Sequence, residues 1–206
     1  MPARGRNAYL SKTLYMRGLQ CPKSLWLDRK QPELRTAPTP DLVARWEAGT
    51  EVGRYAQLLF PGGVEVPYEG FTKEQQLGAT KDLIANGAET IYEATFSFDG
   101  VFVRADILRK GQDGWELYEV KSASDVKPHF PADVAIQYFV ITGSGIPLSR
   151  AFLVHIDTSY VRRGEIDPQK LFARKDLTDL VKRRQPAIPE EIARMREVLA
   201  AGFIAV

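Results

Sequence analysis

The fold is decided by two neighbouring stretches of sequence, Val101-Phe-Val-Arg-Ala-Asp-Ile-Leu108 and Trp115-Glu-Leu-Tyr-Glu-Val-Lys121. Apolar and polar residues alternate in both, as they do along half-buried strands. The four residues between them, Gly111-Gln-Asp-Gly114, are typical of a tight turn. These patterns together predict a β-hairpin, from which the rest of the sheet follows.

Three charged residues converge in this hairpin. An even-length loop centred on the turn pairs Asp106 directly with Glu119, so their Cβ atoms would lie about 5 Å apart. Lys121 lies two positions beyond Glu119 and shares its face, about 7 Å further along the strand. The hairpin therefore predicts two acids and a lysine at one place.

A second hairpin signal precedes the first. Asp99-Gly100 is a strong two-residue turn that joins the strand-like run 89–96 to the strand carrying Asp106. In that register Glu93 lies opposite Asp106, and a row of three carboxylates crosses three adjacent strands. Like charges side by side destabilise a sheet, and a divalent cation would offset them. A fixed ion-pair network without a metal is the alternative.

Composition limits the class of protein. A chain of 206 residues with 44% hydrophobic content is long enough to bury a core as one compact domain. No apolar run reaches the length of a membrane span, and the basic start lacks the apolar stretch of a signal peptide. We therefore expect a cytoplasmic protein with no membrane partner. The net charge of +2 is too small to indicate a polyanion partner by itself.

The rest of the chain alternates helical and strand-like patterns, which predicts an α/β fold. Helices are expected over 11–27, 41–60, 72–86, 131–143, 167–184 and 189–201, and further strands over 64–66 and 150–156. The Pro-rich segment 31–40 is expected to be a loop.

The ordered set of Glu93, Asp106, Glu119-Val-Lys121 and Gln137-Tyr138, within a helix-β-β-β-helix-β order, resembles the PD-(D/E)XK nuclease superfamily. In particular it looks like RecB-type exonucleases, including the CRISPR-associated branch that carries an iron-sulfur cluster. The likeness covers roughly residues 10–172. It implies a restriction-endonuclease-like core, with a mixed central sheet that contains antiparallel hairpins and is flanked by helices.

The resemblance implies metal-dependent hydrolysis of phosphodiester bonds in DNA, most readily as an exonuclease acting on ends or single strands. Asp106 and Glu119 would hold Mg²⁺ or Mn²⁺, with the carbonyl of Val120 as a further ligand. Glu93 would join a second metal site or hydrogen-bond within the first. Lys121 would orient the attacking water or balance the charge that develops on the phosphate.

The helix after the hairpin adds Gln137 and Tyr138, which the resemblance places near the nucleophile, the lysine or the DNA backbone. A helix packed on a sheet also carries such residues for structural reasons, and both interpretations stay open. His129 and His155 have no partner at metal-binding spacing and are expected to be a loop contact and a strand residue.

Two departures from the resemblance matter. Many RecB-type enzymes have a metal-binding histidine where this chain has Gly53, so a ligand is missing. A non-catalytic nucleic-acid-binding or assembly module that keeps the fold is therefore the alternative function. Cys21 matches the first cluster ligand, but a cluster needs about four thiolates and the chain has one cysteine. We favour a fragment that ends before the other cysteines; a plain buried thiol is the alternative for Cys21.

Substrate contacts and domain layout complete the expectations. The candidates for DNA contacts are Arg104, Lys127 and the pair Arg162-Arg163, and DNA-processing proteins are expected as further partners. We expect a single nuclease domain over 1–206. It divides into an N-terminal helical, cluster-type segment (1–40), a nuclease core (41–160) and C-terminal helices cut short (161–206).

Overall fold

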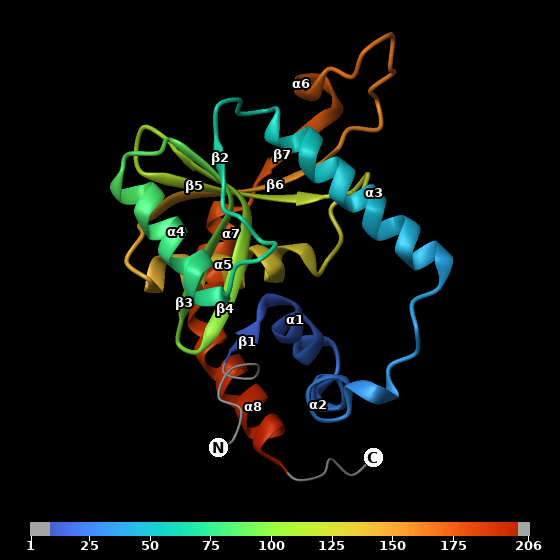
Figure 1. Cartoon of the computed structure of the whole chain (residues 1–206), viewed down its shortest axis with the longest axis vertical. Coiled ribbons are helices and arrows are strands. Elements are labelled where there is room, and N and C mark those ends of the chain that lie inside the picture. The colour runs from blue at the N-terminus through green and yellow to red at the C-terminus, as the bar shows by residue number, and fades with distance from the viewer. Residues whose placement is uncertain (1–8, 202–206) are drawn as a thin grey trace.

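The computed structural model describes residues 9–201, and the basic first residues that entered the expectation about location lie outside this range. Seven strands form one mixed sheet surrounded by helices (Figure 1), which confirms the predicted α/β class. The strands are β1 (Leu10–Ser11), β2 (Val64–Glu65), β3 (Thr90–Phe98), β4 (Val101–Lys110), β5 (Trp115–Lys121), β6 (Leu148–Ile156) and β7 (Phe172–Asp176). The sheet order is β2-β3-β4-β5-β6-β7, and β1 pairs with β4.

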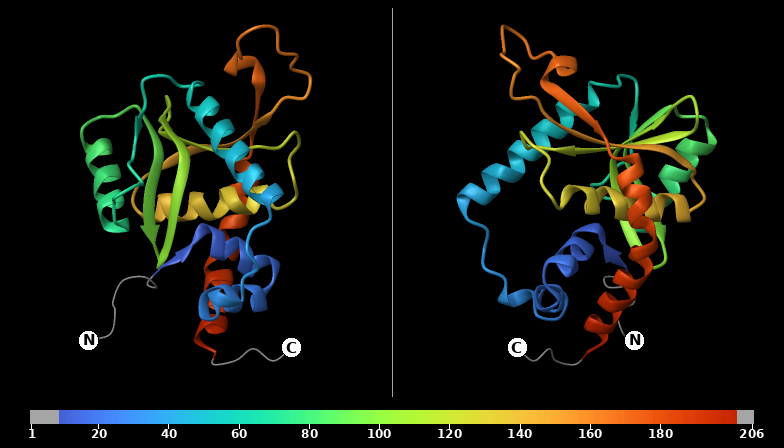
Figure 2. Two further views of the ribbon diagram at one scale, coloured as in Figure 1. Left: turned by 45° about the vertical axis from the view of Figure 1, so that its right-hand side comes forward. Right: turned by 180° about the vertical axis from the view of Figure 1, so that it is seen from behind.

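Helices cover both sides of this sheet (Figure 2). They are α1 (Lys12–Gln20), α2 (Pro22–Lys30), α3 (Pro40–Gln57), α4 (Lys73–Ala85), α5 (Phe130–Gly143), α6 (Pro168–Leu171), α7 (Thr178–Arg184) and α8 (Ile188–Ala200), with short 3₁₀ turns at Pro32–Leu34 and Gln185–Ala187. Helix α5 connects the parallel strands β5 and β6, as a β-α-β crossover requires. No helix within residues 9–201 is both long and apolar enough to cross a membrane.

Both predicted hairpins form in the predicted register. Phe98 pairs with Val101 across the first turn, and Lys110 pairs with Trp115 across the second. The second ladder continues to Ile107 opposite Tyr118, so the next positions along it are Asp106 and Glu119. The sequence pattern therefore placed the two acids correctly relative to one another.

The sheet bends where the acids lie. Tyr92 and Ile107 pack in a smaller core on the α3 side, whereas their neighbours two positions along, Ala94 and Ala105, pack in the main core. Alternate residues of a regular strand share a face, so the strands must turn between these pairs. Glu93 lies at the turn with a φ of 56°, a left-handed conformation that costs a non-glycine residue about 1 kcal/mol or more. The bend opens a space in front of Asp106.

The predicted helix over 11–27 is two helices. Ser11 caps α1, accepting a hydrogen bond from the backbone N–H of Leu14, and Lys12 is its first residue. The extended conformation of Cys21 ends α1, and Pro22 starts α2 in a position that needs no N–H donor. Helices α1 and α2 then pack against α8 from the other end of the chain (Figure 2).

The predicted helix over 167–184 was wrong in its middle. Residues Phe172–Asp176 form strand β7, which pairs antiparallel with β6. Only Phe172 of this strand is buried, and the charged residues after it give no strand alternation. Residues 172–176 therefore form a strand because they pair with β6 at the edge of the sheet, although their local sequence pattern predicts a helix.

Candidate active site

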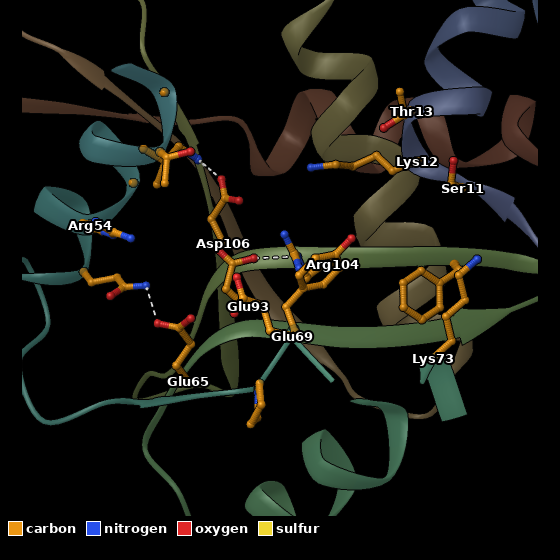
Figure 3. A pocket seen from close by; sticks show the side chains of 18 residues that line it. Ser11, Lys12, Thr13, Arg54, Glu65, Glu69, Lys73, Glu93, Arg104 and Asp106 are labelled. Atoms are coloured by element: carbon orange, nitrogen blue, oxygen red, sulfur yellow. Dashed lines mark hydrogen bonds and ion pairs between the residues drawn. The ribbon is translucent and has the colours of Figure 1, made fainter. Parts of the chain in front are cut away.

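A cavity of about 910 Å³ lies at the bend of the sheet (Figure 3). It is bounded by the start of α1, the end of α3, the β2–α4 connection and the face of β4 that carries Arg104 and Asp106. Its charged side chains are Lys12, Arg54, Glu65, Glu69, Lys73, Glu93, Arg104 and Asp106. Of the sequence-predicted site residues, the cavity is therefore lined by Glu93, Arg104, Asp106 and Val120.

Asp106 is the acid of the second hairpin that lines this cavity. Its Oδ2 accepts a hydrogen bond of 2.6 Å from the backbone N–H of Val120, which ties β4 to β5 where the regular ladder ends. Within residues 9–201 no side chain donates a hydrogen bond or forms an ion pair with this carboxylate. Burial, and then the negative charge of Glu119, raise the pKa of Asp106 to about 8. A desolvated carboxyl group holds its proton more tightly than one in water, and the positive charge of Lys12 opposes this shift only in part.

Glu119, unlike Asp106, is surrounded by cationic and amide side chains. Its side chain is only 1% exposed, and three donors surround its carboxylate. Lys12 Nζ lies 3.0 Å from Oε1 and 3.1 Å from Oε2, Lys121 Nζ lies 2.6 Å from Oε1, and Gln137 Nε2 lies 2.7 Å from Oε2. These contacts draw α1, β5 and α5 together around one carboxylate.

The pKa shifts in this cluster follow from the pairing. Burial alone would raise the pKa of Glu119, but Lys12 and Lys121 outweigh it and hold the pKa below its ordinary value. Burial lowers the pKa of each lysine, whereas Glu119 and then Asp133 raise it more, so that both lysines have a pKa above the ordinary value. All three groups are therefore charged at neutral pH.

Lys12 and Asp133 were missed in the sequence. Asp133 accepts from Lys121 and lies 3.4 Å from Lys12 Nζ, and it stands one helical turn before Gln137 on α5. The i, i+4 spacing of Asp133 and Gln137 was a signal that both side chains share a face. Lys12 gave no such signal, because the contact joins residues 107 positions apart.

Glu93 is paired within the cavity rather than free to bind a metal. Its Oε2 lies 2.7 Å from Nε of Arg104, which also stacks over the ring of Tyr68 with 4.6 Å between the guanidinium carbon and the ring centroid. Burial raises the pKa of Glu93, and Arg104 partly opposes this shift. The three acids occupy the predicted positions on β3, β4 and β5, but regular strand pairing is interrupted there, and Glu93 and Glu119 have their own cationic partners.

Several other predicted site residues lie elsewhere. The hydroxyl of Tyr138 donates to the carbonyl of Leu148 within the main core, a structural contact away from Glu119. Lys127 is exposed in the loop between β5 and α5, and Arg162 and Arg163 are exposed in the loop before α6. Cys21 is a half-buried free thiol between α1 and α2. Of the two histidines, His129 lies at the start of α5, and His155 is a residue of β6 that lies opposite Lys121 in the pairing of β5 with β6.

A divalent cation fits this site only in part. Within residues 9–201 no group of three or more His, Cys, Asp or Glu side chains is arranged to hold a metal ion. Asp106 is nonetheless a half-buried acid that forms no ion pair with a described side chain, and Mg²⁺ is commonly held by one or two carboxylates plus substrate phosphate. Gly53 lines the same cavity, and a Cβ added there would meet no atom within 4 Å. The donor chemistry therefore suits an oxygen-preferring ion held chiefly by Asp106.

Comparison with known proteins shows a likeness in fold. No family model matches this chain, and no curated protein matches it in sequence. An alkaline exonuclease from Laribacter hongkongensis has 11% sequence identity and a TM-score of 0.51, with 94% of this chain and 91% of that chain covered. A candidate exonuclease from Eubacterium rectale has 12% identity and a TM-score of 0.52, with 93% and 81% covered. The chain thus has a nuclease-type fold, as predicted; the RecB-type and iron-sulfur likeness stays a prediction.

Proposed function

We propose that this protein is a divalent-metal-dependent deoxyribonuclease of the RecB-like kind, which removes nucleotides from DNA ends or single strands. The observation that carries the proposal is the meeting of Asp106, Glu119 and Lys121 at the bend of the sheet, beside a cavity of about 910 Å³. The exonuclease descriptions of the two structures similar in fold support the same reaction class.

In this proposal each residue has a separate task. Asp106 and the carbonyl of Val120 would hold Mg²⁺ or Mn²⁺, with Glu119 as a further ligand. When bound, the ion would polarise a phosphate and lower the pKa of a water molecule. Lys121 stabilises negative charge next to Glu119, and Gln137 fixes the orientation of that carboxylate through its 2.7 Å hydrogen bond.

The residues that line the cavity also suit the binding of single-stranded DNA better than the binding of a DNA duplex. Tyr68 and Phe102 supply aromatic faces, and each already holds a cation, Arg104 and Lys73 respectively. Bases stack on such faces without regard to sequence, and the cations meet phosphates. We therefore take single-stranded ends of DNA as the substrate class. The likeness of Cys21 to a cluster ligand would need thiolates beyond these 206 residues.

One observation favours a second function. Glu119 is fully engaged with two lysines and a glutamine, and Gly53 stands where a histidine ligand was expected. A protein that keeps the nuclease fold only to bind nucleic acid or to assemble with DNA-processing partners needs no metal, and ion pairs stabilise its acid cluster instead.

End-labelled DNA separates the two functions. The full chain is incubated with single-stranded, double-stranded and circular DNA in Mg²⁺, Mn²⁺ or EDTA. We expect mononucleotide release from linear single strands with either metal, none from circles, and none in EDTA. Asp106→Asn should lower the rate by at least about 100-fold, since it removes the main ligand, whereas Lys127→Met should leave the rate at saturating DNA unchanged. Tight DNA binding without any cleavage would support the assembly module.

A further inference from the structure

Lys12 forms hydrogen bonds to the carboxylate of Glu119, which is a ligand of the metal ion in the proposed function. Its ammonium bridges both oxygens of Glu119, at 3.0 and 3.1 Å, and lies 3.4 Å from Oδ1 of Asp133. It reaches this position from the first turn of α1, and its side chain points across the cavity toward Asp106 (Figure 3). A positive charge from a distant part of the chain is thus built into the acid cluster.

The hydrogen bonds to Glu119 leave no position for another ligand. A carboxylate offers about four lone-pair sites. Lys12 uses one on each oxygen, Lys121 uses a second on Oε1, and Gln137 uses a second on Oε2. A cation that binds Glu119 must therefore displace one of these three donors.

We propose that Lys12 is a resident cation that competes with the divalent ion for Glu119, and thereby sets the metal affinity of the site. This inference rests on the proposed metal-dependent function. Metal binding then requires the Lys12 ammonium to leave Glu119, and loss of the Lys12 charge opens one position on each carboxylate oxygen. Lys12 acts here as a positioning residue that works through Glu119.

Lys12 is the donor that can be displaced. Its side chain lines the cavity together with Asp106, whereas Lys121 and Gln137 do not. Lys121 is also held by Asp133 and lies over the ring of Phe130, with 5.5 Å between Nζ and the ring centroid. Gln137 is wholly buried on α5. An ion that arrives through the cavity therefore meets Lys12 first.

The exchange needs only a small movement. Asp133 already lies 3.4 Å from the Lys12 ammonium, so the charge keeps a carboxylate partner after Glu119 is released. Helix α1 can stay in place, because four methylene groups give the ammonium its freedom. The cluster thus has two arrangements that differ in which cation Glu119 binds.

Binding of Mn²⁺ to the full chain tests this inference. Isothermal titration calorimetry compares the wild-type protein with Lys12→Met, Lys12→Arg and Lys73→Met. Lys73 is the matched control, because it lines the same cavity with the same charge but lies over the rings of Tyr9 and Phe102, 5.4 and 5.0 Å from their centroids. We expect Lys12→Met to bind Mn²⁺ about tenfold more tightly, since a like charge beside the ion is removed. Lys12→Arg and Lys73→Met should stay within about twofold of the wild type.

Each outcome decides the inference. Unfolding curves in EDTA confirm that the variants fold, and Lys12→Gln replaces the methionine variant if that one does not. Asp106→Asn should abolish binding in both backgrounds, which locates the ion. If the wild type binds Mn²⁺ and Lys12→Met binds no more tightly, or if Lys73→Met gains as much, the inference alone is wrong. If no protein of the set binds Mn²⁺, the proposed function fails with it.

Discussion

The two acids of the hairpin lie in contrasting regions of one site. The closed side is the cluster of Glu119 with Lys12, Lys121, Asp133 and Gln137, where every charge has a partner. The open side is the cavity in front of Asp106, where the carboxylate accepts one backbone hydrogen bond and forms no ion pair with any side chain of residues 9–201. Two acids at neighbouring positions on adjacent strands, just beyond the end of the regular ladder, therefore have opposite electrostatic environments. The comparison indicates that in the metal-free protein Glu119 holds the cationic cluster together, while Asp106 is accessible to a ligand from the cavity.

Substitution of each acid in turn should give the largest difference between the two sides, measured as the change in the free energy of unfolding. Glu119→Ala leaves the two half-buried ammonium groups of Lys12 and Lys121 with Asp133 as the one carboxylate of the cluster, and loss of one member of a buried ion pair costs about 3–5 kcal/mol. Asp106→Asn replaces a desolvated carboxyl group whose one described hydrogen bond, from the N–H of Val120, an amide oxygen can also accept, so it should leave the metal-free protein at least as stable as the wild type. Urea unfolding in EDTA measures both free energies. Equal destabilisation by the two variants would show that the regions do not differ.

The dependence of stability on pH should sharpen the comparison. The pKa of Asp106 is raised from 3.8 to about 8, first by burial and then by Glu119, so the folded protein holds a proton that the unfolded chain releases. Stability should therefore fall as pH rises between these two values, by at most about 1.4 kcal/mol per pH unit. Glu119 contributes with the opposite sign, since its pKa is lowered, but that contribution is complete above its ordinary value of 4.5.

Urea unfolding in EDTA at about pH 5 and about pH 8 gives the measurement, and Asp106→Asn is its control. Glu93 and the lysines are the same in both proteins, so the difference between them isolates Asp106. We expect the wild type to lose more stability than the variant between the two conditions. Parallel losses would mean that the open carboxylate is charged throughout and already has a counterion.

A histidine at position 53 should add an imidazole metal ligand to the cavity in front of Asp106. Gly53 lies on α3 at the cavity wall, and its position has room for a Cβ. Gly53→His should strengthen Mn²⁺ binding about tenfold, because imidazole is a good ligand for transition metals, and should also favour the helix. Gly53→Ala shares the helix effect without the ligand and is the control. Calorimetry in which both variants bind like the wild type would exclude position 53 from the metal site.

The hairpins were predictable because local chemistry specifies them. Two glycine-containing turns, together with the apolar and polar alternation along β4, specify the register of β3, β4 and β5 and with it the relative positions of Asp106 and Glu119. Strand β7 was missed because its pairing with β6 comes from tertiary structure, which its charged residues do not reveal.

The partners of the acids were harder to predict than the acids. The ion pair of Lys12 with Glu119 depends on β1, a two-residue strand whose pairing with β4 brings α1 to the site. Nothing near Lys12 in the sequence signals that pairing. The left-handed Glu93 likewise bends the sheet against its own local preference, which sequence alternation cannot show. The sequence therefore locates the charges, and the tertiary fold decides which of them neutralise one another.

The smallest predicted effect concerns how DNA reaches the open side. Arg54 and Lys73 line the cavity, whereas Lys127 and the pair Arg162-Arg163 lie in exposed loops outside its lining. Each phosphate contact to a single strand adds about −0.7 to the slope of log affinity against log salt. We expect Arg54→Ala and Lys73→Ala each to flatten that slope by about 0.7, and the double variant by about 1.4, if both bind phosphates independently. Fluorescence anisotropy with labelled single-stranded DNA in EDTA gives the slopes without cleavage. Flattening by Lys127→Ala or by the Arg162-Arg163 double variant, with the cavity variants unchanged, would show that the strand runs over the loops as the sequence suggested.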